Sequence, residues 1–113
     1  MIRNKEVNRG DVYWVTLDPT IGTEINKTRP AIVISNNTQN KISSRIVVIP
    51  ITSNTNNLYH FEAKITINNK EAKALTDQIR TIDKIRLGSF IARLNRAEII
   101  EVEKALRIAL SLS

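Results

Sequence analysis

Residues 45–51 read RIVVIPI, and they carry the strongest structural signal in the chain. The segment Ile46-Val47-Val48-Ile49 is the most β-branched part of the sequence, and β-branched side chains favour strands. We therefore predict a strand over residues 45–51 at the centre of a sheet. Because Pro50 has no backbone N–H to donate to a ladder, we expect sheet pairing to loosen there and to release into a loop the polar residues Thr52, Ser53 and Asn54.

Two apolar segments before this strand predict two more strands. Residues 11–17 contain alternating β-forming side chains and end at the turn residues Asp18-Pro19. The run Ala31-Ile32-Val33-Ile34 is short enough for a buried strand. Between this run and the central strand, residues 36–40 (NNTQN) predict a polar connection.

The pattern is weaker after the central strand. Residues 59–67 predict a strand, and Asn68-Asn69 predicts a turn. Residues 74–82 predict two short extended pieces around Asp77-Gln78. Residues 86–94 fit no single element.

The last segment predicts an amphipathic helix. Asn95 and Glu98 have the spacing of a capping box, and apolar residues then recur at helical intervals at Ile99, Val102, Leu106 and Ala109. Five or six short strands followed by this helix predict a strongly bent sheet or a small barrel with the helix packed on it. The length of 113 residues predicts a single domain, residues 1–113. Three apolar residues lie off the helical stripe and either widen its core-facing side or cover a partner: Ile100, Leu110 and Leu112.

The composition favours a nucleic-acid partner. Seventeen Lys and Arg against eleven Asp and Glu give a net charge of +6, which raises the local concentration of a polyanion. An ordinary basic surface would give the same sum, so the inference needs a site to support it. No stretch is apolar and long enough for a signal peptide or a membrane span, and we expect a cytoplasmic protein with no membrane partner.

The same composition disfavours metal chemistry. The absence of cysteine removes disulfides, thiolate zinc sites and cysteine nucleophiles. The single histidine, His60, lies in a strand-like segment, where a surface or core role is expected. The carboxylates that would have to bind two metal ions are scattered along the sequence, at Asp11, Asp18, Glu24 and Asp77. We therefore expect no metal and no cofactor.

Arg29 is the first candidate for a catalytic residue. Because it precedes Pro30, it is disfavoured from the helical region and held extended at the start of a buried strand. Its planar guanidinium matches a phosphate and can stabilise the extra charge of a pentacoordinate transition state. It is better suited to that role than to donating a full proton, since its solution pKa lies above ~12. The alternative is a strand-end arginine paired with Glu24 or Asp18.

Three other side chains complete the candidate site. Thr52 and Ser53 offer adjacent hydroxyls that can orient a phosphate oxygen or a ribose hydroxyl, although such residues usually cap turns. Glu24 can take the proton of an attacking 2'-hydroxyl, although a solvated loop carboxylate is the simpler interpretation. No residue is identified as the general acid.

Four segments form a longer pattern with its order and loop spacing kept: RGDVYWVTLDPTIGTEINKTRPAIVIS (residues 9–35), VVIPITS (47–53), DQIRTIDKIRLG (77–88) and the terminal helix. This pattern resembles the MazF/PemK/Kid family of toxins from toxin-antitoxin pairs. The resemblance implies a mainly β fold, an SH3-like small barrel of five to seven short strands with a C-terminal amphipathic helix. It also implies a homodimer that acts as a sequence-specific endoribonuclease on single-stranded RNA.

The resemblance further implies a chemistry and a set of site residues. In this family the ribose 2'-hydroxyl attacks the neighbouring phosphate without a metal, leaving a 2',3'-cyclic phosphate and a 5'-hydroxyl. The family's catalytic arginine falls on Arg29 and its hydroxyl residue on Thr52, while Glu24 matches a carboxylate used in some members. Positions near the RNA groove, or in the two loops that would contact bases, are Ser53, Asp77, Gln78, Lys27, Thr28 and Asn54.

One departure from the family pattern bears on the mechanism. Some members carry a catalytic arginine two residues before the Asp of the Asp-Gln pair, where this chain has Leu75. That favours a mechanism centred on Arg29 and Thr52 over one centred on Asp77.

Partners and alternatives follow from the same resemblance. It implies a cognate antitoxin whose disordered acidic segment competes with RNA for the basic surface. A CcdB-like toxin, which binds a DNA topoisomerase without catalysis, shares the fold but ends in a tryptophan-bearing tail that this chain lacks. A simple RNA-binding barrel would present clustered aromatic residues, whereas the aromatics here are spread along the sequence. Trp14 is expected in the core, with a groove-lining role as the less favoured alternative.

Overall fold

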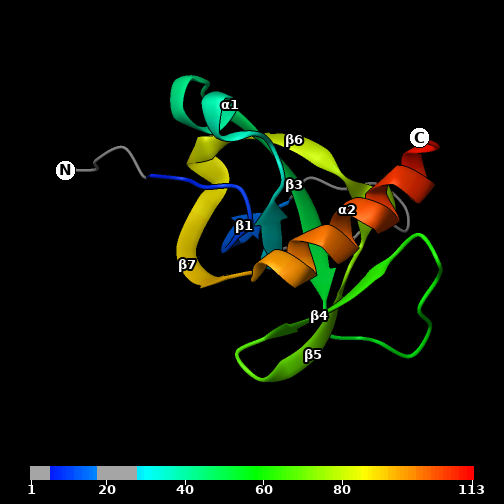
Figure 1. Cartoon of the computed structure of the whole chain (residues 1–113). Coiled ribbons are helices and arrows are strands. Elements are labelled where there is room, and N and C mark those ends of the chain that lie inside the picture. The colour runs from blue at the N-terminus through cyan, green and yellow to red at the C-terminus, as the bar shows by residue number, and fades with distance from the viewer. Residues whose placement is uncertain (1–5, 18–27) are drawn as a thin grey trace.

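The computed structural model describes residues 6–17 and 28–113. Seven strands and a long C-terminal helix lie within these residues, which confirms the predicted mainly β fold (Figure 1). In chain order the elements are β1 (Asp11–Thr16), β2 (Thr28–Val33), α1 (Asn37–Ile42), β3 (Arg45–Thr52), β4 (Ala63–Ile67), β5 (Lys70–Ala74), the 3-10 turn η1 (Thr76–Gln78), β6 (Arg80–Asp83), the 3-10 turn η2 (Lys84–Arg86), β7 (Leu87–Arg93) and α2 (Arg96–Leu110).

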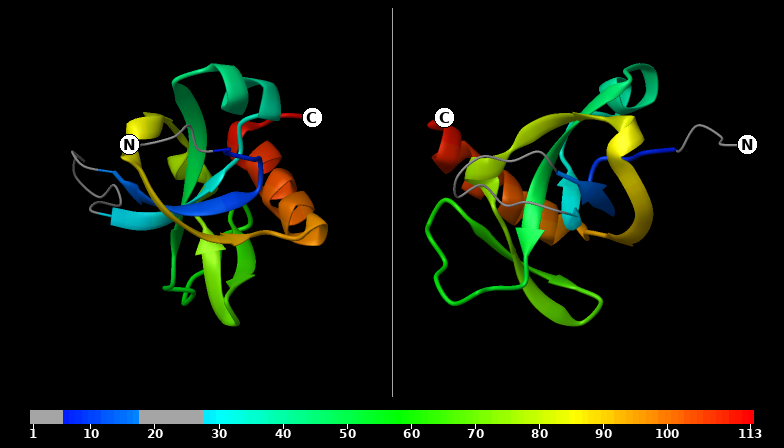
Figure 2. Two further views of the ribbon diagram at one scale, coloured as in Figure 1. Left: turned by 90° about the vertical axis from the view of Figure 1, so that its left-hand side faces the viewer. Right: turned by 180° about the vertical axis from the view of Figure 1, so that it is seen from behind.

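The strands form one antiparallel sheet in the order β4-β5-β3-β2-β1-β7, and β6 also pairs with β3. β3 therefore pairs with three strands, as expected for the predicted central strand. The sheet curls around it into a half-barrel, and the β4–β5 hairpin projects from one end (Figures 1 and 2).

Pro50 changes the partner of β3 and does not end the strand. The ladder to β2 runs from Val33↔Val48 to Ala31↔Pro50, and β3 then pairs with β5 through Ile51↔Ala74 and Thr52↔Lys73. The expected end of pairing is confirmed for the ladder to β2, and Ser53 and Asn54 follow the strand as predicted, but the release of Thr52 into the loop was wrong. Proline cannot donate, but its carbonyl still accepts a bond from Leu75 N at 2.9 Å, so the strand continues to Thr52.

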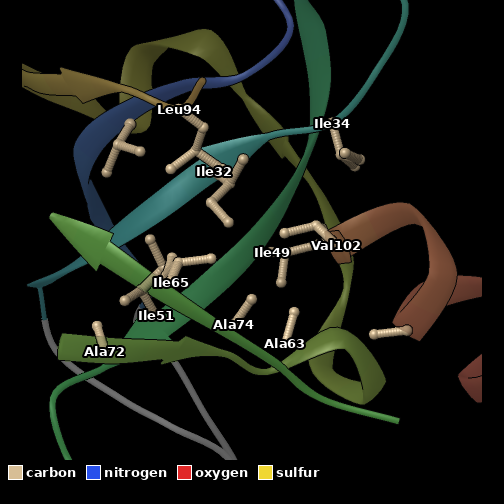
Figure 3. Close-up of a cluster of buried hydrophobic side chains, with 12 residues drawn as sticks. Ile32, Ile34, Ile49, Ile51, Ala63, Ile65, Ala72, Ala74, Leu94 and Val102 are labelled. Atoms are coloured by element: carbon tan, nitrogen blue, oxygen red, sulfur yellow. The ribbon is translucent and has the colours of Figure 1, made fainter. Parts of the chain in front are cut away.

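The two faces of the sheet bury two apolar clusters. On one face Ile49 and Ile51 of β3 belong to a cluster that also contains Val102 of α2 (Figure 3). On the other face Val48 lies in a second cluster with side chains of β1, β2 and β6. This alternation follows from the two-residue period of a strand.

The segment predicted as a polar connection is a short helix, α1. Asn36 caps it by accepting a bond from Gln39 N at 2.8 Å. Asn40 is buried and donates from Nδ2 to the Ser35 carbonyl at 2.9 Å. Polar side chains of residues 36–40 therefore stabilise a helical turn.

The strand expected over residues 59–67 begins only at Ala63. Tyr59 and Glu62 close a turn before it, because Glu62 N donates to the Tyr59 carbonyl and Tyr59 N donates to Glu62 Oε1. The Asn68-Asn69 turn is confirmed, with φ of 49° and 67°, values that asparagine tolerates better than most residues. Strand β5 begins at Lys70, earlier than predicted, and the ambiguous segment 86–94 contains β7.

Helix α2 begins with the predicted capping box. Asn95 Oδ1 accepts from Glu98 N at 2.8 Å, and Glu98 Oε1 accepts from Asn95 N at 3.1 Å. Ile100, Leu110 and Leu112 remain exposed, so they do not widen the core-facing side. Within the described residues, no helix is long and apolar enough to cross a membrane.

We expect Asn95→Ala to lower the free energy of unfolding by about 1 kcal/mol, because it leaves helical N–H groups without their cap. Urea unfolding followed by circular dichroism measures the change. Arg96→Ala, at the exposed next position, is the matched control and should change the unfolding free energy by less than about 0.5 kcal/mol. Equal unfolding midpoints for Asn95→Ala and the wild-type chain would show that the capping box does not stabilise the fold.

Candidate active site

Arg29 is the second residue of β2, in the part of that strand that does not pair with β3. It pairs with Val15 of β1, and its side chain is half-buried. The extended backbone expected from Pro30 is therefore confirmed. The register that sets Ala31 against Pro50 would bring Arg29 opposite Thr52 if it continued for two residues, but β3 turns to β5 at this point.

A cavity of about 280 Å³ lies beside the Arg29 side chain, and we call it the Arg29 cavity. Its walls include Thr28 and Ser53, both predicted to contact substrate, and Trp14. The expectation that Trp14 is a core residue was wrong, since 43% of its surface is exposed. Side chains of β1 alternate between buried and exposed from residue 13 to residue 16. Trp14 takes an exposed position, where it lines the cavity.

A second cavity, of about 310 Å³, lies beside Thr52, and we call it the Thr52 cavity. Three of the predicted site residues line it: Thr52, Asn54 and Gln78. Thr52 is the last residue of β3, and Ser53, which follows it, lines the Arg29 cavity and not this one. The candidate site is thus two cavities, each lined by residues at the end of β3 or directly after it.

The Thr52 hydroxyl is oriented by its own loop. Its Oγ1 accepts a hydrogen bond from Asn54 N at 3.2 Å, which is the turn-capping role weighed from the sequence. That bond uses a lone pair of the oxygen and leaves the O–H as a donor toward a ligand. Capping and substrate contact are therefore compatible at this residue.

The Asp77-Gln78 pair is divided between the cavity and the surface. Both residues lie in η1, which is anchored by the Thr76 hydroxyl donating to the Phe61 carbonyl. Gln78 lines the Thr52 cavity, whereas Asp77 is exposed and lines neither of the two cavities. Leu75, at the position where some relatives carry an arginine, is buried in the wall of the Thr52 cavity.

Two predicted site residues, Glu24 and Lys27, lie outside the described residues, and their roles stay predictions. Within residues 6–17 and 28–113, no three His, Asp or Glu side chains lie close enough together to hold a metal ion. His60, for which a surface or core role was expected, is exposed.

The sequence interpretation missed a buried ion pair in the wall of the Thr52 cavity. Lys73 Nζ donates to Glu62 Oε1 at 2.9 Å and to the Asn57 carbonyl, and it lies 5.7 Å from the ring centroid of Tyr59. The signal was present in the sequence as a single lysine within the apolar run Ala72-Lys73-Ala74-Leu75. Charged residues are rarely buried unless they are paired.

A second buried carboxylate lies in β1. Asp11 is 1% exposed and accepts bonds from Arg93 Nε at 2.7 Å and from Asn8 N at 3.0 Å. The hydrogen bond to Asp11 raises the pKa of Arg93, while burial, and then the Asp11 charge, raise the pKa of Tyr13. These contacts hold Asp11 in a structural role, and it lines neither cavity.

The chain matches a known protein family over nearly its whole length. Residues 8–110 match the model of the PemK-like, MazF-like toxin of type II toxin-antitoxin systems. The chain belongs to this toxin family. The sequence resemblance is thereby confirmed, and the family match includes the strands and loops that build both cavities.

Individual relatives agree over nearly the whole length. The chain is 36% identical to Endoribonuclease MazF9 of Mycobacterium tuberculosis, covering 94% of this chain and 98% of that protein. It is 38% identical to Endoribonuclease MazF of Staphylococcus epidermidis, covering 95% and 93% of the two chains. Its fold is similar to that of MazF from Deinococcus radiodurans, with a TM-score of 0.84, 24% identity, and coverage of 96% and 99%.

Proposed function

We propose that this chain is the toxin of a toxin-antitoxin pair and cleaves single-stranded RNA, in particular mRNA, at specific sequences without a metal ion. Endoribonuclease activity is the function of its MazF relatives in the toxin family to which it belongs. The observation that supports the finer chemistry is the Arg29 cavity, which Arg29 and Ser53 both line.

The proposed reaction needs no group beyond those of the chain and the RNA. The ribose 2'-oxygen attacks the neighbouring phosphorus and loses its proton, and the bond to the 5'-oxygen breaks as that oxygen gains a proton. The products are a 2',3'-cyclic phosphate and a 5'-hydroxyl. The largest demand is stabilisation of the charged pentacoordinate phosphorus, and a fixed guanidinium meets it at the phosphate oxygens.

Each predicted residue has a place in this proposal. Arg29 stabilises the phosphorane charge, Thr52 and Ser53 orient the nucleotides on either side of the strand end, and Glu24 accepts the 2'-hydroxyl proton. Thr28, Asn54 and Gln78 contact the RNA from the cavity walls. Lys27 and Asp77 are also proposed to contact the RNA.

The partners belong to the same proposal. One relative of similar fold, an endoribonuclease from a mycobacterial species, is described in complex with its cognate antitoxin, with a TM-score of 0.80 and 23% identity over 95% of this chain and 97% of that one. We infer that the chain forms a homodimer, as the sequence resemblance implies. We also infer that an antitoxin with a disordered acidic segment blocks this dimer, because such a segment is complementary to a chain of net charge +6. A toxin that cuts mRNA acts in the cytoplasm.

Digestion of a mixed single-stranded RNA in excess chelator tests the chemistry. We expect cleavage to proceed at the same rate with and without chelator, and every 3' product to begin with a 5'-hydroxyl. The upstream fragments should resist phosphatase until acid opens the cyclic phosphate. A requirement for added magnesium, or products with a 5'-phosphate, would exclude the proposed mechanism.

A further inference from the structure

Lys73 lines the Thr52 cavity and is buried between the apolar residues Ala72 and Ala74 of β5. Its surface is 8% exposed, and its partner Glu62 has a side chain that is 5% exposed. Replacing such a buried ion pair with apolar residues is often neutral or stabilising, so the pair is weak evidence for a role in stability. Its position beside Thr52, with which Lys73 pairs across the β3–β5 ladder, indicates a role in the site.

The contacts of Lys73 leave one donor for a ligand. An ammonium has three N–H groups, and two of them are directed to Glu62 Oε1 and to the Asn57 carbonyl. These two bonds hold the side chain in place and tie the loop after β3 to β5. Lys73 also lines the cavity, and its third N–H is the group that we assign to an acceptor of the ligand.

The Thr52 cavity suits a nucleobase better than a phosphate. Lys73 and Glu62 offset each other, so the wall carries little net charge for an anion. Tyr59 lines the same wall and is stacked on Phe61, with ring centroids 5.3 Å apart and planes at 2°, which fixes an aromatic surface at the cavity. A volume of about 310 Å³ lies at the small end for ligand pockets and accommodates a single base.

We propose that the Thr52 cavity binds one base of the RNA and that Lys73 reads a carbonyl oxygen on that base; this rests on the proposed function. A donor-only group favours guanine (O6) and uracil (O4), and it disfavours adenine and cytosine, which present an amino group at the equivalent position. Because Thr52 and Ser53 are consecutive and line the two cavities, the base read by Lys73 belongs to a nucleotide next to the cleaved phosphate.

Sequencing of the cut sites in a randomised single-stranded RNA tests this proposal. The wild-type chain should prefer guanine or uracil over adenine and cytosine about tenfold at one position beside the cut, the size expected for a hydrogen bond to a charged group. Lys73→Met should reduce this preference to about twofold or less at that position only. The paired variant Glu62→Gln with Lys73→Met should do the same without leaving a buried charge unpaired, and it keeps the test valid if Lys73→Met unfolds.

Lys64→Met is the matched control, since Lys64 is exposed on β4, pairs with Glu71 at 3.1 Å and lines neither cavity. It should leave every preference unchanged. An unaltered base preference in the Lys73 variants would overturn the proposal. An equal loss of cleavage rate for all sequences, together with a weaker salt dependence of RNA binding, would also overturn it, because Lys73 would then contact a phosphate. If the wild-type chain cuts no RNA, the proposed function fails, and the base-binding proposal is tested by RNA binding alone. Tighter binding of oligouridine than of oligocytidine, with the difference lost in Lys73→Met, would support base recognition by Lys73. Equal binding of the two oligonucleotides by the wild-type chain would refute it.

Discussion

Arg29→Ala is expected to lower kcat for RNA cleavage by about 10²- to 10³-fold. The guanidinium is held on a paired strand and lines a cavity at the end of the sheet. Its charge is most useful when the phosphorus becomes pentacoordinate, so the substitution should reduce kcat more than it raises KM. Single-turnover cleavage of a short RNA that contains one cut site measures the effect.

Two further variants separate this role from a general effect of positive charge. Arg29→Lys keeps the charge but loses the planar fork, and it should recover only part of the activity. Arg45→Ala removes an exposed arginine at the far end of β3 and changes the net charge by the same amount. If Arg45→Ala reduced kcat as much as Arg29→Ala, the effect of Arg29 would be one of net charge, and the proposed transition-state contact would be wrong.

The fold was predictable wherever a single physical signal governed a segment. The β-branched run at residues 45–51 predicted the central strand, and the spacing of Asn95 and Glu98 predicted the helix start. The failures lie where tertiary contacts outweigh local preference. Asn40 is buried in a helix because the Ser35 carbonyl accepts its amide N–H, and no sequence pattern shows that contact in advance.

The candidate site was predictable as a set of residues but not as an arrangement. Arg29 and Thr52 were taken as one centre, and the structure assigns them to adjacent cavities because β3 leaves β2 at Pro50 and turns to β5. Such a change of strand partner depends on hydrogen bonding between segments distant in sequence. Lys73 was missed for the related reason that its partners, Glu62 and the Asn57 carbonyl, lie in a loop whose path the sequence does not define.

Thr52→Val is expected to lower kcat by about 10²-fold, the second largest effect. Valine keeps the β-branched shape that suits the end of β3, so the ladder pair with Lys73 should persist while the hydroxyl is lost. Thr52→Ser restores the hydroxyl and should return most of the activity. The same single-turnover assay measures both variants, and circular dichroism verifies that the fold is retained.

Ser53→Ala distinguishes the two adjacent hydroxyls, because Ser53 lines the Arg29 cavity and Thr52 does not. We expect a smaller loss for Ser53→Ala, since the family's hydroxyl residue falls on Thr52. If Ser53→Ala proved the more damaging variant, the reacting phosphate would lie within the Arg29 cavity alone, and Thr52 would act through the base held beside Lys73. The relative size of the two losses therefore locates the cleaved bond with respect to the end of β3.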